Sequence, residues 1–88
     1  MSQLLFSEKA WNEYLYWQGQ DKKTLRRLNA LLKDIQRSPY SGIGLPEPLR
    51  YSQNGAWSRR IDEKNRIVYK VLDKDTIQIA QCLGHYDD

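Results

Sequence analysis

The sequence predicts an α+β fold, in which two helices near the N-terminus cover one face of a mainly antiparallel sheet in the order β-α-α-β-β-β-β. Two observations predict it. Apolar residues recur at helical spacing between residues 8 and 37, and the chain after residue 48 has short runs rich in Ile and Val, separated by turn signals. A chain of 88 residues buries only about 60–65% of its unfolded surface, which is enough for one core and too little for two. We therefore expect one domain over residues 1–88.

The N-terminal part of the chain predicts a strand followed by two helices. The apolar run at residues 3–6 predicts the strand, and Ser7 is a good N-cap for a helix over residues 8–18 with an apolar and aromatic inner face. Asp21 is the N-cap candidate for a longer helix that stops before the Ser-Pro pair at residues 38–39. The buried stripe of this second helix is expected to consist of Leu25, Leu28, Leu31, Leu32 and Ile35.

The second predicted helix carries the basicity of the chain. Residues 22–37 contain six basic residues and one acidic residue, a net charge of +5, so the rest of the chain carries −2 of the overall +3. At about 100° per residue, the buried stripe spans an arc of roughly 120° and the basic residues a separate arc of roughly 140°. Such a surface is typical of proteins that bind polyanions. We call it the basic face: Lys22, Lys23, Arg26, Arg27, Lys33 and Arg37.

The remaining segments predict strands. Asn54-Gly55 is a strong hairpin signal, and it joins a predicted strand at residues 49–52 to the segment AWSRRID. The segments RIVYKVL and TIQIAQCL follow, each preceded by a short polar turn, at residues 63–65 and 73–75. Helices packed on one side of such a sheet leave its other face open.

Composition excludes several classes of protein. A single Cys82 cannot form an internal disulfide, and one Cys with one His cannot assemble a zinc site alone. We expect no metal and no cofactor, and we expect Cys82 to be a small buried hydrophobe. The chain shows neither an apolar run long enough to span a membrane nor a signal-peptide pattern, so we expect a cytoplasmic protein that does not engage a membrane.

Candidates for chemistry lie after the second helix. Glu47 stands in PEP, where the flanking prolines hold its carboxylate on a stiff loop, and it is either a base or an ordinary solvated residue. His85 is the one histidine, and its ordinary pKa of about 6.5 suits proton transfer, although a residue so near the end can also be without function. Tyr86 either contacts the substrate or docks on the sheet.

Three arginines at positions 59, 60 and 66 favour phosphate binding, because the planar guanidinium matches phosphate oxygens. Alternate residues of a strand share a face, so Arg59 and Arg60 point opposite ways and at most one of them joins Arg66 on the open side. The alternative is that these side chains cover apolar surface with their stems.

These motifs together resemble the YoeB toxins of bacterial toxin–antitoxin pairs, within the wider RelE superfamily. The segments that carry the resemblance are AWNEYLYW, GIGLPEPLRYSQNGAWSRRI, WSRRIDEKNRIVYKV and the terminal HY, so that it runs from about residue 4 to residue 86. It implies a microbial-ribonuclease-like fold, an endonuclease that cuts mRNA in the ribosomal A site, and a neutralising antitoxin of the YefM type. It leaves a homodimer open, and it fixes neither the codon preference nor the antitoxin sequence.

Carried over residue by residue, the resemblance implies the catalytic set Glu47, Arg66, His85 and Tyr86. It also implies phosphate contacts by Arg50, where relatives often have Lys, and by Arg59. In cleavage by attack of the RNA 2′-OH, Glu47 and His85 would act as base and acid, in either assignment. Arg66 would stabilise charge and Tyr86 would orient the base or the phosphate. The extra Asp87 and Asp88 depart from the pattern.

Two other classes of function stay open on the sequence alone. A non-catalytic nucleic-acid-binding module would use the basic face and stacking aromatic residues, but it gives the pairing of Glu47 with His85 no purpose. A pure interaction protein would bind an acidic partner through the same face. Whether the protein is a ribonuclease or a non-catalytic binding module, the residues expected to contact RNA include Lys22, Lys23, Arg26, Arg27 and Lys33.

Overall fold

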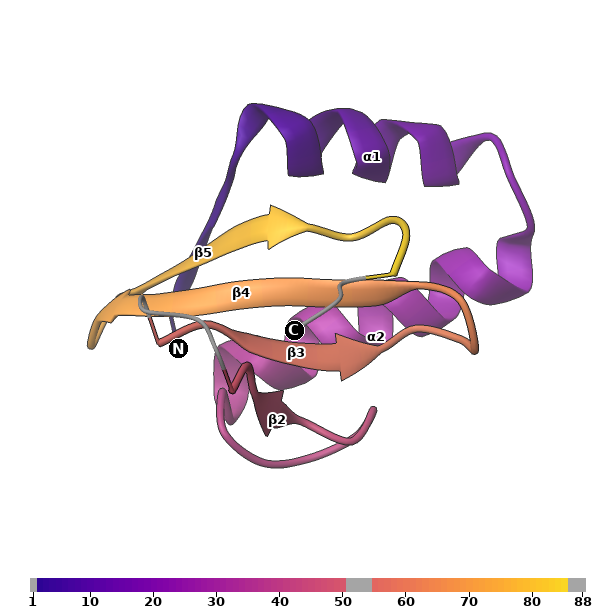
Figure 1. Ribbon diagram of the computed structural model, residues 1–88. Helices are drawn as coiled ribbons and strands as arrows, with labels where there is room; N and C mark the ends of the chain where they lie inside the picture. Colours follow the sequence, from indigo (N-terminus) through magenta and orange to yellow (C-terminus); the bar gives the residue numbers. More distant parts are fainter. Residues whose placement is uncertain (1, 51–54, 86–88) are drawn as a thin grey trace.

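The computed structural model describes residues 2–50 and 55–85, and it confirms the order of elements expected from the sequence. The elements are β1 (Gln3–Phe6), α1 (Glu8–Gln18), α2 (Lys22–Arg37), β2 (Glu47–Pro48), β3 (Trp57–Arg60), β4 (Arg66–Asp73) and β5 (Thr76–Gln81). The sheet has the strand order β1-β5-β4-β3-β2. β1 runs parallel to β5 and the other neighbouring strands are antiparallel, so the sheet is mixed but mainly antiparallel (Figure 1).

Both helices begin at the residues that the sequence indicated. The Ser7 hydroxyl accepts the Ala10 N–H at 3.0 Å, which caps α1. The Asp21 carboxylate accepts the N–H groups of Lys23 and Thr24 at 3.3 and 3.2 Å, which caps α2. These caps satisfy backbone donors that have no partner within the first helical turn.

One apolar core joins the two helices to one face of the sheet. The α2 side chains Leu28, Leu31, Leu32 and Ile35 and the α1 side chains Ala10 and Trp17 are buried together with Ile67, Tyr69, Ile77 and Ile79 of the central strands. The strand members of the core alternate along β4 and β5, as a sheet with one covered face requires. Neither helix in the described part of the chain has the length and apolar character needed to cross a membrane.

The strand predicted at residues 49–52 is wrong in position. β2 comprises only Glu47 and Pro48, which pair with Ser58 and Trp57 of β3. Leu49 adds one hydrogen bond from its N–H to the Ala56 carbonyl at 2.9 Å, and residues 51–54 lie outside the described residues. The flanking prolines had indicated a stiff loop around Glu47. The structure instead has a short edge strand there, where a residue without an N–H is tolerated.

Candidate active site

The face of the sheet away from the helices carries two of the expected catalytic residues. Ile67 and Tyr69 of β4 point into the core, so their neighbours Arg66 and Val68 point away from it. Strand partners share a face, which places Glu47, Ser58 and Arg60 on the same side as Arg66 and Val68. We call this side the helix-free face.

Arg66 and Glu47 contact each other on the helix-free face. The Arg66 Nη1 donates to Glu47 Oε1 at 2.7 Å and to the Ser58 hydroxyl at 3.1 Å. The Arg66 side chain is 16% exposed and the Glu47 side chain is 56% exposed. A fixed, largely buried cation therefore lies beside a carboxylate that a substrate can reach. Sequence analysis did not single out Ser58, although strand alternation puts it on the same face as Arg60.

Contacts from α1 hold the end of β5. The Glu13 carboxylate accepts the Cys82 N–H at 2.9 Å, and the Trp17 indole N–H donates to the Cys82 carbonyl at 2.7 Å. The Cys82 side chain is fully buried, as expected, and burial raises the pKa of its thiol to about 12. The chain leaving β5 is thus fixed before it reaches the segment that bears His85.

The next residues bring the chain to the start of β4. The Gly84 N–H donates to the Asn65 Oδ1 at 2.7 Å, and the Gly84 carbonyl accepts the Arg66 N–H at 3.0 Å. His85 follows directly and is exposed. The structure therefore brings the one histidine to the end of β4 where Arg66 lies. Tyr86 lies outside the described residues, so its role stays a prediction.

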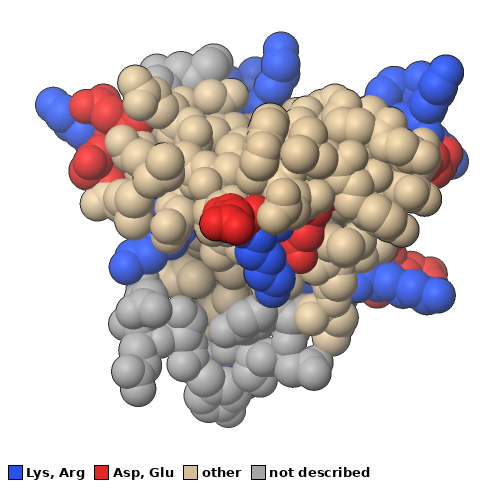
Figure 2. Space-filling view, turned by 90° about the horizontal axis from the view of Figure 1, so that it is seen from above, with Lys and Arg blue, Asp and Glu red and all other residues tan. Residues whose placement is uncertain are grey.

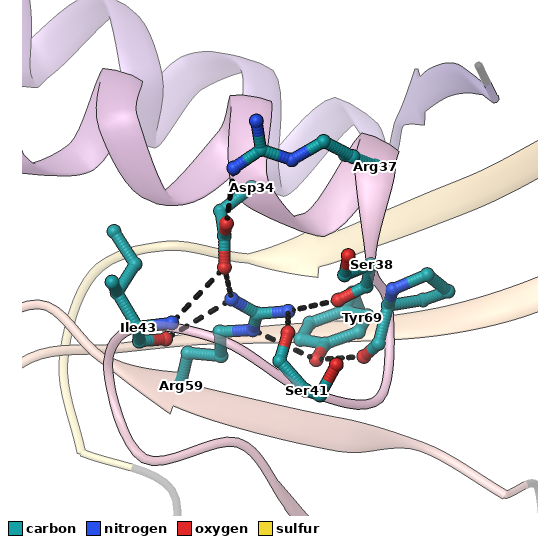
Figure 3. A network of polar contacts seen from close by, with 8 residues as sticks. Asp34, Arg37, Ser38, Ser41, Ile43, Arg59 and Tyr69 are labelled. Carbon is teal, nitrogen blue, oxygen red and sulfur yellow. Dashed lines mark hydrogen bonds and ion pairs between the residues drawn. The ribbon is translucent and has the colours of Figure 1, made fainter.

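Arg59 is not available to phosphate, and its assignment as a phosphate contact is corrected. Its side chain is fully buried between the carboxylate of Asp34, which belongs to α2, and the loop that follows this helix (Figure 3). A guanidinium has five N–H donors, and each has an acceptor here: Asp34 Oδ2, Tyr69 Oη at 3.1 Å, and the carbonyls of Ser38, Ser41 at 2.9 Å and Ile43 at 3.0 Å. No donor remains for a substrate.

Arg60 takes the place that the sequence analysis gave to Arg59. It is exposed, and it pairs in register with Arg66 on the helix-free face. Alternation along the strand established that only one of the two adjacent arginines joins Arg66, and the structure shows which one. Arg50 is exposed in the turn after Leu49.

The basic face of α2 is exposed but is not brought together with Glu47 and Arg66. All six of its residues are exposed. α2 packs its buried stripe against the covered side of the sheet (Figure 1). The basic face points away from that stripe, so it lies on the opposite side of the molecule from the helix-free face. The surface over α1 is mostly uncharged, with most Lys and Arg at its margins (Figure 2).

Asp34, the one acidic residue of α2, does not offset the basic face. Its carboxylate accepts from Arg59, from the Ile43 N–H at 3.0 Å and from Arg37 at 3.1 Å, and its side chain is 11% exposed. Hydrogen bonding from the Arg59 guanidinium is the main reason that the pKa of Asp34 lies below its ordinary value. The negative charge is thus compensated inside the protein. Among the residues that the structure describes, His, Cys, Asp and Glu side chains form no group of three that could hold a metal ion.

Comparison with known proteins identifies the family. A family model described as the YoeB-like toxin of bacterial type II toxin-antitoxin system matches residues 6–86. The chain belongs to this family. Toxin YoeB of Escherichia coli (strain K12) is 49% identical to this YoeB-like toxin over 83 residues, which are 94% of this chain and 98% of that protein. The resemblance inferred from the sequence motifs is therefore confirmed.

Solved structures of other YoeB proteins have the same fold. The YoeB dimer from Staphylococcus aureus superposes with a TM-score of 0.87 at 43% identity, covering 97% of this chain and 98% of that one. In a heterotetrameric YoeB-YefM toxin-antitoxin complex from Staphylococcus aureus, the matching chain gives a TM-score of 0.84 at 42% identity, covering 98% of this chain and 99% of that one. These matches support the α+β architecture of this YoeB-like toxin over nearly its whole length.

Proposed function

We propose that this YoeB-like toxin is an endoribonuclease that cleaves mRNA in the A site of the ribosome, by attack of a 2′-OH on the adjacent phosphate. The observation that carries the proposal is the 2.7 Å contact between Glu47 and Arg66 on the helix-free face. A module that only binds nucleic acid gains nothing from a carboxylate at its phosphate site, since the carboxylate repels phosphate. A nuclease of this kind needs one group that accepts a proton and one that donates a proton, and a carboxylate can serve as either.

The reaction assigns one role to each group. Glu47 accepts the 2′-OH proton while the 2′-oxygen forms a bond to phosphorus, and His85 donates a proton to the 5′-oxygen as its bond to phosphorus breaks. Arg66 stabilises the charge that accumulates on the phosphate oxygens. The products are a 2′,3′-cyclic phosphate and a 5′-OH. Glu47 and His85 can also exchange the roles of base and acid.

Arg60 and Arg50 supplement Arg66 as phosphate contacts in this proposal. Arg60 shares the helix-free face with Arg66 and is exposed, so it can meet the phosphate that precedes or follows the cleaved one. Tyr86, the residue after His85, orients the base or the phosphate.

The ribosome supplies the mRNA and the surfaces that surround the toxin. Because the basic face and the helix-free face lie on opposite sides, mRNA on one face leaves the other available to ribosomal RNA. The toxin acts where ribosomes are, in the cytoplasm. A YefM-like antitoxin is the proposed inhibitor, supported by the complex of the relative that is 42% identical, and self-association is supported by the dimer of the relative that is 43% identical.

A test uses the purified toxin with translating ribosomes on a defined mRNA. We expect cuts within A-site codons whose 3′ ends are 2′,3′-cyclic phosphates, mapped by primer extension and by end-group analysis. The same mRNA without ribosomes is the control and should be cut far more slowly. Intact mRNA at stoichiometric toxin and ribosome would favour the module that binds without cleaving.

A further inference from the structure

We propose that Asn65 is a positioning residue that holds His85 in its place beside Arg66. The proposal rests on the proposed function, because it concerns the group assigned as the general acid. Asn65 lies in the turn between β3 and β4, and its side chain reaches across to the segment that follows β5.

The Asn65 side chain is fixed at both ends. Its Oδ1 accepts the Gly84 N–H at 2.7 Å, and its Nδ2 donates to both carboxylate oxygens of Asp62 at 3.1 Å. An ionised carboxylate only accepts hydrogen bonds, so the amide cannot be turned around without losing both contacts. The carbonyl end of Asn65 is therefore held toward Gly84.

The turn that carries Asn65 is itself ordered by hydrogen bonds. Asp62 Oδ1 accepts the N–H groups of Lys64 at 2.8 Å and Asn65 at 2.7 Å. The Ile61 N–H donates to the Asn65 carbonyl at 2.9 Å. A side chain projecting from such a turn has few conformations to lose when it binds a second segment.

Gly84 is bound on both sides of its peptide unit, directly before His85. Its N–H donates to Asn65 and its carbonyl accepts from the backbone of Arg66 at 3.0 Å. Gly84 has φ of 91°, in the left-handed region that favours glycine, so the chain changes direction here. Of these two bonds, only the one from Asn65 depends on a side chain, and removing it leaves the Gly84 peptide unit with its backbone bond to Arg66. Upstream of Gly84, the chain is held at Cys82 by α1 and at Leu83 by packing against the core.

A general acid acts only within hydrogen-bond reach of the leaving oxygen, so a loosened segment lowers the fraction of molecules that can react. We expect Asn65→Ala to slow single-turnover cleavage by about 10–100-fold. The ribosome affinity should change by less than about twofold, because Asn65 belongs neither to the basic face nor to the proposed phosphate contacts Arg50, Arg60 and Arg66.

A double-mutant cycle separates positioning from a general structural role. If Asn65 acts through His85, then Asn65→Ala should have almost no further effect on the rate in a His85→Gln background. Equal losses in both backgrounds would overturn the proposal, as would a folded Asn65→Ala protein that cleaves at the original rate. Lys64→Ala, in the same turn and exposed, is the matched control and should leave the rate unchanged.

A second readout does not depend on cleavage. His85 is the one histidine in the chain, so its imidazole NMR signals are assigned without ambiguity. We expect Asn65→Ala to change the chemical shifts of these signals, and Lys64→Ala to leave them unaltered. Unaltered imidazole signals in Asn65→Ala would overturn the proposal even if the toxin did not cleave mRNA.

A charge-swapped variant covers the case in which Asn65→Ala does not fold. Asn65→Asp combined with Asp62→Asn retains an acceptor for Gly84 and a donor–acceptor pair within the turn. We expect this double variant to keep the imidazole signals and most of the cleavage rate, whereas Asn65→Asp alone places two carboxylates together and should lose both. Loss of both properties in the swapped variant, with the fold intact, would contradict the proposal.

Discussion

Arg66 is held by two acceptors that would behave differently in the proposed reaction. Glu47 loses its negative charge when it takes a proton, whereas the Ser58 hydroxyl, 3.1 Å from Arg66, does not. Ser58 can therefore hold the guanidinium in place at the moment when Glu47 releases it. The pair is also accessible, because Glu47 is more than half exposed.

We expect Arg66→Ala to slow the chemical step by about 10²–10³, the scale for removal of one preorganised charge donor. Its effect on stability should be small, because Glu47 is left in contact with water rather than buried without a partner. Single-turnover cleavage and thermal unfolding measure the two effects. A large loss of melting temperature with near-normal cleavage would show that Arg66 is structural.

The adjacent Arg59 and Arg60 form a matched pair for a second prediction. Arg59→Met leaves Asp34 without its buried partner and should cost about 3–5 kcal/mol in the free energy of unfolding. Arg60→Met should cost less than about 0.5 kcal/mol, since the residue is exposed, and should weaken mRNA cleavage instead. Chemical denaturation and cleavage assays of both variants are the measurement. Similar stabilities for the two variants would contradict the assignment of faces.

At the scale of the elements, Asp34 links α2 to the loop that leads into β2. Through Arg59 it fixes the carbonyls of Ser38, Ser41 and Ile43, and the Arg60 N–H donates to the Gly44 carbonyl at 2.8 Å. A side chain at Gly42 would place its Cβ 2.0 Å from the Asp34 carboxylate, so this loop closes only with glycine at that position. The position of Glu47 thus depends on a helix on the other side of the sheet.

This link makes stability depend on pH. The pKa of Asp34 is lowered from its ordinary value of 3.8, chiefly by the hydrogen bond from Arg59, so the folded state binds this proton less readily than the unfolded state. The stabilisation is complete above the unfolded pKa and is lost as the pH falls through the lower folded value. We expect urea denaturation from about pH 6 to pH 2 to show this decline, and Asp34→Asn to be less stable at neutral pH with a flatter decline. An equally steep decline in Asp34→Asn would contradict this account.

The basic face of α2 predicts salt-dependent binding to the ribosome. Replacing Lys22 and Arg26 with Gln should weaken association and reduce the salt slope, by about 0.7–0.9 for each lost phosphate contact. Replacing Lys9 and Lys74, which are exposed on other parts of the molecule, removes the same charge and should alter the slope much less. Equal changes in the two variants would mean that only net charge matters.

Local patterns in the sequence predicted most elements, while long-range hydrogen bonds decided the details of the site. Ser7 and Asp21 marked both helix starts because a cap depends only on the next three residues. Strand alternation could not tell Arg59 from Arg60, because it gives opposite faces without saying which face is covered. No sequence pattern singled out Asn65, because its side chain binds the backbone N–H of Gly84, nineteen residues away.

At the scale of the whole molecule, the helices and the basic face lie on one side, and the candidate catalytic residues Glu47 and Arg66 lie on the other. The segment after β5 leads to the end of β4 where Arg66 lies. Among the described residues, its last contributions to the core are the buried Cys82 and the partly buried Leu83. Binding and chemistry should therefore be separable by shortening the chain.

We expect a chain that stops after Gly84 to fold and to bind ribosomes, but to cleave about 10²–10⁴-fold more slowly, because it lacks the proposed acid. A chain that stops after Tyr86 should retain the original rate or exceed it slightly at low salt, since removal of Asp87 and Asp88 takes away two negative charges that repel RNA phosphate. Circular dichroism, ribosome binding and single-turnover cleavage of both chains provide the measurement. Full activity in the shorter chain would remove His85 from the mechanism.

The place of β5 in the sheet determines when the sheet of this toxin can close. β5 is the last of the strands to be synthesised, yet it lies between β1 and β4, and β1 has no other neighbour among the described strands. Until it emerges from the exit tunnel, the first strand made has nothing to pair with, and Glu13 and Trp17 of α1 have no Cys82 backbone to bind. β1 therefore cannot join the sheet until β5 has been synthesised. The sheet that holds Glu47, Arg66 and the segment before His85 in one arrangement is therefore complete only after β5 has been made.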